Sequence, residues 1–246
     1  MNDLPILDVQ GVSKYFGGLQ ANEDVSFHVN KGEIVSIIGP NGAGKSTLFS
    51  CVTGFHRLDK GRVLFKGQDI SNWKPHSIGK LGVVRTFQIA QVISDMTVLE
   101  NVMTGAFLRH TNVPDVRRKA EKVLTFTGLF EKRESNATAL SISDKKRLEV
   151  SMALAMEPEL LMLDESMAGL TVVELREMIE LIRKVRESGI TVVVVEHVME
   201  AVMELSDRVV VLNSGRKIVE GPPKEVVANP EVIRAYLGER YNAVRQ

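Results

Sequence analysis

The chain has 246 residues, and its 31 Lys and Arg residues balance its 31 Asp and Glu residues, so its formal net charge at pH 7 is zero. This balance argues against a protein that binds nucleic acid through a broad basic surface. The single cysteine, Cys51, excludes an intramolecular disulfide and fits a reducing cytoplasm. The N-terminal residues MNDLP do not resemble a signal peptide, and no apolar run approaches the roughly 20 residues of a membrane helix. We therefore expect a soluble protein that reaches a membrane only through a partner.

The first part of the chain predicts an antiparallel β layer that leads into a nucleotide-binding core. Residues 6–12 and 24–29 are predicted strands, and residues 30–32 form a turn into a short apolar strand at 34–38. Residues 62–65 form a further predicted strand, because a Lys-Gly pair stands on each side of it.

The nine residues after the strand at 34–38, GPNGAGKST, fit the phosphate-loop pattern G-x-x-x-x-G-K-[ST] in full. The glycines let backbone N–H groups turn toward phosphates, and the helix predicted to follow adds the positive end of its dipole. Lys45 supplies a charge for the β- and γ-phosphates, and the Ser46 hydroxyl is a ligand for Mg²⁺. A glycine-rich turn without a ligand is the alternative, and the strict spacing argues against it. The predicted ATP-binding residues of this loop are Gly39, Pro40, Asn41, Gly42, Ala43, Gly44, Lys45, Ser46 and Thr47.

The middle of the chain changes to helical patterns. Residues 97–100 form a capping box that begins a helix, residues 116–130 predict a second helix with Gly128 near its end, and residues 141–155 predict a third. We therefore expect a helical insertion at 89–155 between two parts of an α/β core.

The α/β pattern then returns with a buried strand at 160–163. A second capping box at 171–174 begins an amphipathic helix that ends at Gly189. Strands are predicted at 190–195, 208–212 and 217–220, and short helices follow.

Two acidic residues, Asp164 and Glu165, stand at the end of the buried strand at 160–163. The carboxyl ends of strands are where α/β sheets bind ligands. Asp164 is placed to hold Mg²⁺, and Glu165 is placed to polarise the water that attacks the γ-phosphate. A strand that simply leads into a helix cap can also end in two acidic residues. The phosphate loop upstream makes the functional interpretation more specific.

The chain resembles the ATP-binding subunits of ABC transporters nearly from end to end. Within that family it is most similar to importer subunits that serve branched-chain amino acids. The resemblance rests on VSKYFGGLQA at 12–21, VRTFQ at 84–88, VVEHVM at 194–199, DRVVVL at 207–212 and AYLGE at 235–239.

The resemblance implies roles for three further positions. Phe16 would stack on adenine, with Tyr15 as the alternative. Gln88 would contact Mg²⁺ and the attacking water, and would join the core to the helical insertion. His197 would sense and position the γ-phosphate. Without the family, Phe16 is a strand-packing residue, Gln88 is uninformative and His197 is a structural histidine.

One motif departs from the family pattern. Members usually carry Leu-Ser-Gly-Gly-Gln before a helix, where the backbone approaches the ATP of the opposite subunit. Here residues 140–144 are LSISD, so both glycines are absent. Side chains at these positions hinder close approach of the backbone. Ser141 is still expected to donate to a γ-phosphate. Ser166 and Thr171 are smaller departures, since the family usually has proline at the first position and Asn or Asp at the second.

We therefore expect an α/β protein with a RecA-like P-loop NTPase core, an N-terminal antiparallel β layer and an inserted α-helical subdomain. Residues 1–246 form a single ABC ATP-binding domain, with 1–88 and 156–246 as core and 89–155 as helical subdomain. The resemblance implies an ATPase that uses Mg²⁺, in a dimer of ATP-binding subunits, at the cytoplasmic face of the membrane. A permease helix would bind near residues 88–98, and an extracytoplasmic solute-binding protein would act indirectly.

Three alternatives remain, and the third belongs to another class of function. One is an export ATPase of the same fold, for example for lipid, and the second is a hydrolysis-poor ATP-binding subunit of a heterodimer. The third is a soluble ATPase of this family that remodels nucleic acid or ribosomes. That class usually has two ATP domains or a long coiled-coil insertion, and this chain has neither. We expect no nucleic-acid partner.

Overall fold

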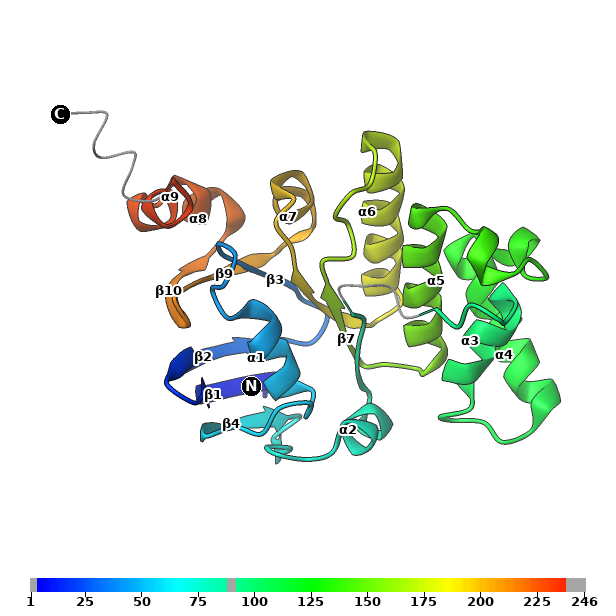
Figure 1. Ribbon diagram of the computed structural model, residues 1–246, viewed down its shortest axis with the longest axis horizontal. Helices are drawn as coiled ribbons and strands as arrows, with labels where there is room; N and C mark the ends of the chain where they lie inside the picture. The colour runs from blue at the N-terminus through cyan, green and yellow to red at the C-terminus, as the bar shows by residue number, and fades with distance from the viewer. Residues whose placement is uncertain (1–3, 88–91, 238–246) are drawn as a thin grey trace.

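The computed structural model describes residues 4–87 and 92–237, so the predicted site residue Gln88 lies outside the described residues. Two sheets organise these residues (Figure 1). The smaller sheet is antiparallel and confirms the predicted β layer. Its strands, in spatial order, are β2 (Leu19–Val29), β1 (Leu7–Phe16), β4 (Lys60–Phe65) and β5 (Gln68–Asp69).

The larger sheet has six strands, of which the five from β9 to β6 are parallel and β10 pairs antiparallel at one edge. Strands β3, β7 and β8 are buried along their whole length, because both faces of this sheet are covered. The order is β10 (Arg216–Gly221), β9 (Arg208–Asn213), β3 (Ile34–Ile38), β8 (Thr191–Val195), β7 (Leu160–Asp164) and β6 (Val83–Arg85).

Helices cover the two faces of the six-stranded sheet differently (Figure 1). Helix α1 (Lys45–Val52) lies between the two sheets, where its Phe49 shares a buried cluster with Val9 of β1 and Ile37 of β3. The other face carries α6 (Val172–Glu187), α7 (Met199–Leu205), α8 (Pro223–Ala228) and α9 (Pro230–Leu237). No helix in the described parts of the chain is long and apolar enough to cross a membrane.

The segment between β6 and β7 is helical where the structure describes it, and it lies at one end of the molecule (Figure 1). Its elements are α3 (Val98–Ala106), α4 (Val113–Thr127), η1 (Phe130–Lys132), η2 (Ala137–Ala139) and α5 (Ile142–Ala155). Helices α3 and α5 cross closely at Gly105, where an added Cβ atom would lie 2.3 Å from the Met152 carbonyl oxygen. The exact division of the chain at residues 88 and 155 stays a prediction.

Several elements differ from the sequence-based expectation. The second helix of the insertion, α4, begins at Val113 and ends at Thr127, because Pro114 occupies its first turn and Gly128 adopts φ 77° just after it. Helix α2 (Pro75–Leu81), strand β6 and helix α7 were not predicted. Each has at most seven residues, too few for a hydrophobic period to be recognised. Both predicted capping boxes are confirmed, at Thr97 with Glu100 and at Thr171 with Glu174.

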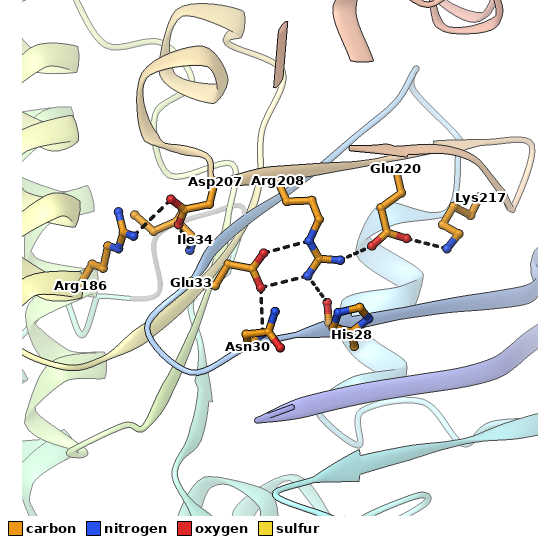
Figure 2. A network of polar contacts seen from close by, with 9 residues as sticks. All are labelled: His28, Asn30, Glu33, Ile34, Arg186, Asp207, Arg208, Lys217 and Glu220. Atoms are coloured by element: carbon orange, nitrogen blue, oxygen red, sulfur yellow. Dashed lines mark hydrogen bonds and ion pairs between the residues drawn. The ribbon is translucent and has the colours of Figure 1, made fainter. Parts of the chain in front are cut away.

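A polar network joins the two sheets (Figure 2). Arg208 at the start of β9 donates two hydrogen bonds to the Glu33 carboxylate, at 2.8 and 2.9 Å, and one to the His28 carbonyl oxygen of β2 at 2.6 Å. It also pairs with Glu220 of β10. Because Arg208 contacts both sheets, it fixes the β layer against the strand that leads into the phosphate loop.

Candidate functional site

The phosphate loop lies between β3 and α1, as its sequence predicts. Helix α1 begins at Lys45, with Gly44 as the residue before it. The Leu48 N–H donates to the Gly44 carbonyl oxygen at 2.9 Å, and the Ala43 N–H donates to the Pro40 carbonyl oxygen at 3.1 Å. The loop is therefore a compact turn that leaves the N-terminus of α1 facing the cavity described below.

Two glycines of the loop are required by close approach of the backbone. Gly39 has φ 151°, and an added Cβ would lie 2.1 Å from the Leu212 carbonyl oxygen. Gly44 has φ 95°, and its added Cβ would lie 2.2 Å from the Ala21 carbonyl oxygen. The two glycines are therefore required where the backbone of β9 and β2 contacts the loop, in addition to any requirement set by a phosphate.

Lys45 is buried within its own loop, with 7% of the residue exposed. Its Nζ donates to the carbonyl oxygens of Gly39 at 2.7 Å and Pro40 at 3.0 Å. Burial lowers the pKa of Lys45, and the carboxylates of Glu165 and Asp164 oppose this shift. The side chain is therefore fixed on two loop carbonyl oxygens, within electrostatic reach of both acidic residues.

Asp164 ends β7 and is almost fully buried, with 1% exposed. One carboxylate oxygen, Oδ2, accepts a 2.8 Å hydrogen bond from Arg85 on the neighbouring strand β6. Burial raises the pKa of Asp164, and the charge of Arg85 opposes that rise. The other oxygen, Oδ1, is buried without a hydrogen-bond partner among the described residues.

This unsatisfied oxygen fits a metal-binding role for Asp164. A buried carboxylate oxygen without a donor is costly unless a cation or water satisfies it. Carboxylate and hydroxyl oxygens are the ligands that Mg²⁺ prefers. The described residues contain no cluster of three or more His, Cys, Asp and Glu side chains that would hold a metal by themselves. We therefore expect that Mg²⁺ would be held by Asp164 and Ser46 together with phosphate oxygens.

Glu165 follows Asp164 in a left-handed conformation, with φ 50°. Its N–H donates to the Val195 carbonyl oxygen of β8 at 2.9 Å, and its own carbonyl oxygen accepts from Lys146 Nζ at 3.0 Å. Two residues further on, the Met167 N–H donates to the buried Glu196 carboxylate at 2.7 Å. The backbone around Glu165 is therefore held from three sides.

A cavity of about 510 Å³ brings the predicted nucleotide-binding residues together. Its lining includes Lys45 and Ser46 of the loop and also Glu165. Phe16 lines the same cavity from the β1–β2 hairpin and is 42% exposed. Tyr15 does not line it, and its ring lies 6.0 Å from Lys60 Nζ instead. The geometry therefore favours Phe16 over Tyr15 as the aromatic residue that faces a nucleotide base.

His197 follows β8 on the loop to α7 and is exposed. Its backbone N–H donates to Glu196 Oε2 at 3.2 Å. The structure places His197 two residues after Val195, whose carbonyl oxygen holds Glu165, so the two predicted residues belong to adjoining loops. His197 does not line the cavity, and its role stays a prediction.

Ser141 lies at the N-cap of α5, where its hydroxyl is already engaged. The Asp144 N–H donates to Ser141 Oγ at 3.1 Å, and Oγ donates to Asp144 Oδ2 at 3.1 Å. Lys132 of η1 pairs with the same carboxylate. Ile142, which replaces the first glycine of the family pattern, is 68% exposed. Ser141 is therefore a helix cap beside a carboxylate, which is a weak arrangement for a phosphate.

Sequence reasoning missed Arg85, Glu196 and Lys146. Arg85 is enclosed by the rings of Phe49, Phe55 and Phe87 while it pairs with Asp164. None of the three was assigned a role from the sequence, although Arg85 and Glu196 stand in the stretches VRTFQ and VVEHVM that carry the family resemblance, and Lys146 stands in a basic run at 145–147. Glu196 is 1% exposed next to the all-valine end of β8, and burial raises its pKa.

A parallel sheet, a complete phosphate loop and a strand-end acidic pair, of which Glu165 lines the same cavity as the loop, define a P-loop ATPase. Comparisons with known proteins give the family. A model of the ABC transporter family matches residues 22–168, and a model for branched-chain amino acid ATP-binding cassette transporters matches residues 216–242. The chain belongs to the ABC transporter family and contains its ATP-hydrolysing cassette.

Relatives match over nearly the whole chain. The high-affinity branched-chain amino acid transport ATP-binding protein LivG of Escherichia coli is 40% identical over 251 residues, which is 96% of this chain and 98% of LivG. The probable LivG of Archaeoglobus fulgidus is 38% identical over 249 residues, 96% of each chain. A crystal structure of a nucleotide-free ATP-binding cassette from an ABC transporter has a TM-score of 0.89 and 34% identity, covering 96% of this chain and 100% of that one.

Proposed function

We propose that the chain is the subunit that hydrolyses ATP to power an ABC importer for branched-chain or other amino acids. The observation that carries the ATPase role is the shared cavity, which brings Glu165 to the phosphate loop with Lys45 and Ser46. The amino-acid cargo is supported by the names of relatives at 38–40% identity and by the C-terminal match at 216–242.

In the proposed mechanism the protein positions charges and does not form a covalent intermediate. Lys45 and the N–H groups of the phosphate loop bind the β- and γ-phosphates. Mg²⁺, held by Asp164 and Ser46 and by Gln88, would neutralise charge on the phosphate oxygens. Glu165 orients the attacking water and polarises it, while His197 would sense and position the γ-phosphate. Phe16 stacks on adenine from the hairpin.

The proposed partners are a second ATP-binding subunit and a membrane permease. Two ATP-binding subunits would enclose ATP between them, and closure would bias the permease between two states. A groove of about 490 Å³ at the junction of the core and the helical segment is the proposed seat of a permease helix. Phe107 lies in it 48% exposed, and Arg85 links its floor to Asp164. We place the subunit at the cytoplasmic face of the membrane, with an extracytoplasmic solute-binding protein acting indirectly.

A heterodimer is the second candidate, and the Ser141 geometry supports it. The hydroxyl that would approach the partner's γ-phosphate donates to Asp144 instead, and that carboxylate repels a phosphate. A partner with the usual glycines would then complete the site built from Lys45 and Glu165. The site completed by this chain's own loop would hydrolyse poorly.

Steady-state ATP hydrolysis by the purified chain, with Glu165→Gln as control, tests the proposal. Turnover that disappears in the variant supports the ATPase and shows that a homodimer suffices. Bound ATP without turnover favours the heterodimer. Failure to bind ATP with Mg²⁺ would contradict the proposal.

The cargo is tested by uptake of labelled leucine in cells that lack this chain. Uptake should fall, and the wild-type chain should restore it while Lys45→Ala should not. Unchanged leucine, isoleucine and valine uptake would remove the branched-chain assignment. Loss of lipid export would favour the exporter.

A further inference from the structure

Lys146 on α5 contacts the backbone of the proposed catalytic glutamate. Its Nζ donates to the Glu165 carbonyl oxygen at 3.0 Å, across 19 residues of sequence. Burial lowers the pKa of Lys146, and the carboxylates of Glu196, Glu149 and Glu165 oppose this. A partly buried ammonium group among three carboxylates has a fixed place, unlike a solvated surface lysine.

The contact between Lys146 and Glu165 joins the helical segment to the loop that carries Glu165. The Val195 carbonyl oxygen and the Glu196 carboxylate, which also anchor the loop, come from β8 or its end in the core. The Ala168 N–H, within the loop itself, donates to the same Glu165 carbonyl oxygen at 3.4 Å. Lys146 alone among the described anchors comes from the helical segment. It is five residues after Ser141, on the helix that the family's signature loop begins.

A second contact fixes the same helix one turn further on. Glu149 Oε1 accepts a 2.7 Å hydrogen bond from the Phe87 N–H, just after β6. Residues three apart share one face of a helix, so α5 presents Lys146 and Glu149 together to two loops of the core. The location of α5 therefore determines where the Lys146 donor meets Glu165.

We infer that Lys146 is a positioning residue that holds the left-handed backbone of Glu165, so that the carboxylate faces the attacking water only when α5 is docked. A non-glycine residue at φ 50° persists where surrounding contacts hold it, and Lys146 supplies one of them. The inference rests on the proposed catalytic role of Glu165. It makes the helical segment a determinant of catalytic rate in the chain's own site, separate from any contact across a dimer.

The test compares Lys146→Met, Lys146→Arg and Lys145→Met. Lys145 is the matched control, because it lies beside Lys146 on α5 and its side chain has no hydrogen bond or ion pair to the described residues. Lys146→Met should lower the kcat for ATP about tenfold, the size expected for losing one charged hydrogen bond, with KM and ATP affinity within about twofold. Lys146→Arg should recover most of the rate, because arginine keeps a charged donor, and Lys145→Met should match wild type.

The rate of amide hydrogen exchange over residues 160–170 tests the same contact independently of ATP hydrolysis. Lys146→Met should exchange at least about threefold faster there than Lys145→Met, while residues 34–48 stay unchanged. Equal exchange in both variants overturns the inference, as does a wild-type kcat in Lys146→Met. If instead Glu165→Gln hydrolyses ATP like wild type, the proposed role of Glu165 fails, which is a distinct outcome.

Discussion

At the scale of single residues, Lys45 is the position on which ATP binding depends most. Its ammonium group is held in the loop on two carbonyl oxygens, and the side chain lines the cavity that we propose binds ATP. We expect Lys45→Ala to weaken ATP binding at least ~100-fold, because a charge-assisted contact to phosphate is lost. Isothermal titration calorimetry measures this directly. Lys31→Ala on an exposed turn is the control, and unchanged affinity in Lys45→Ala would contradict the phosphate-loop assignment.

Isothermal titration calorimetry also tests whether Phe16 or Tyr15 stacks on adenine. Phe16 lines the cavity, whereas Tyr15 lies beside Lys60. Phe16→Ala should weaken ATP binding roughly fivefold, about 1 kcal/mol for one aromatic stacking contact, while Tyr15→Ala should leave it unchanged. The opposite ranking would assign adenine stacking to Tyr15.

At the scale of elements, Arg208 decides how firmly the β layer is attached. Its side chain is 16% exposed and pairs with two carboxylates and a strand carbonyl (Figure 2). Arg208→Ala leaves the half-buried Glu33 carboxylate with its hydrogen bond from the Asn30 N–H but without its charged partner, so we expect a loss of about 2–3 kcal/mol in the free energy of unfolding. Urea denaturation checks this. Arg216→Ala removes an exposed ion pair with Glu23 and should cost under about 1 kcal/mol; equal losses would show that the network adds little.

The same network predicts how stability depends on pH. Burial by itself would raise the pKa of Glu33, but its hydrogen bonds to Arg208 and to the Asn30 N–H hold that pKa below the ordinary 4.5. A lowered carboxylate pKa stabilises the fold above the unfolded pKa, and this stabilisation is lost as pH falls through the folded pKa. The difference in unfolding free energy between wild type and Glu33→Gln should therefore be constant near neutrality and shrink below about pH 4.5. A difference that grows on acidification would reverse the sign of this argument.

At the scale of the whole molecule, the proposed dimer would bring the exposed signature region of one subunit against the nucleotide cavity of the other. Val172, Val173 and Ile142 are each at least 59% exposed on neighbouring helix starts, which suits burial against a second subunit. Glu165→Gln should leave the phosphate loop intact and slow hydrolysis, so we expect ATP to trap a dimer. Size-exclusion chromatography with ATP and with ADP measures it. A monomer in ATP, even with the natural partner subunit, would count against the enclosed-nucleotide model.

Much of the fold followed from local patterns. The phosphate loop, the acidic pair at the end of β7 and both capping boxes were predictable, because each is a contiguous run whose spacing has a direct physical meaning. The β layer was predictable from its turn residues and from the alternation of apolar and polar residues along its strands. The short elements α2, β6 and α7 did not, since their length carries too little periodicity.

By itself, the sequence determined that a phosphate-binding loop and a strand-end carboxylate pair exist, because their chemistry is written in adjacent residues. Only the tertiary structure decided which charges meet. Arg85 reaches Asp164 because β6 pairs with β7, 79 residues apart, and Lys146 reaches Glu165 because α5 docks on the core. Such pairings depend on strand order and helix docking, which burial of the shared core fixes and which no local spacing encodes.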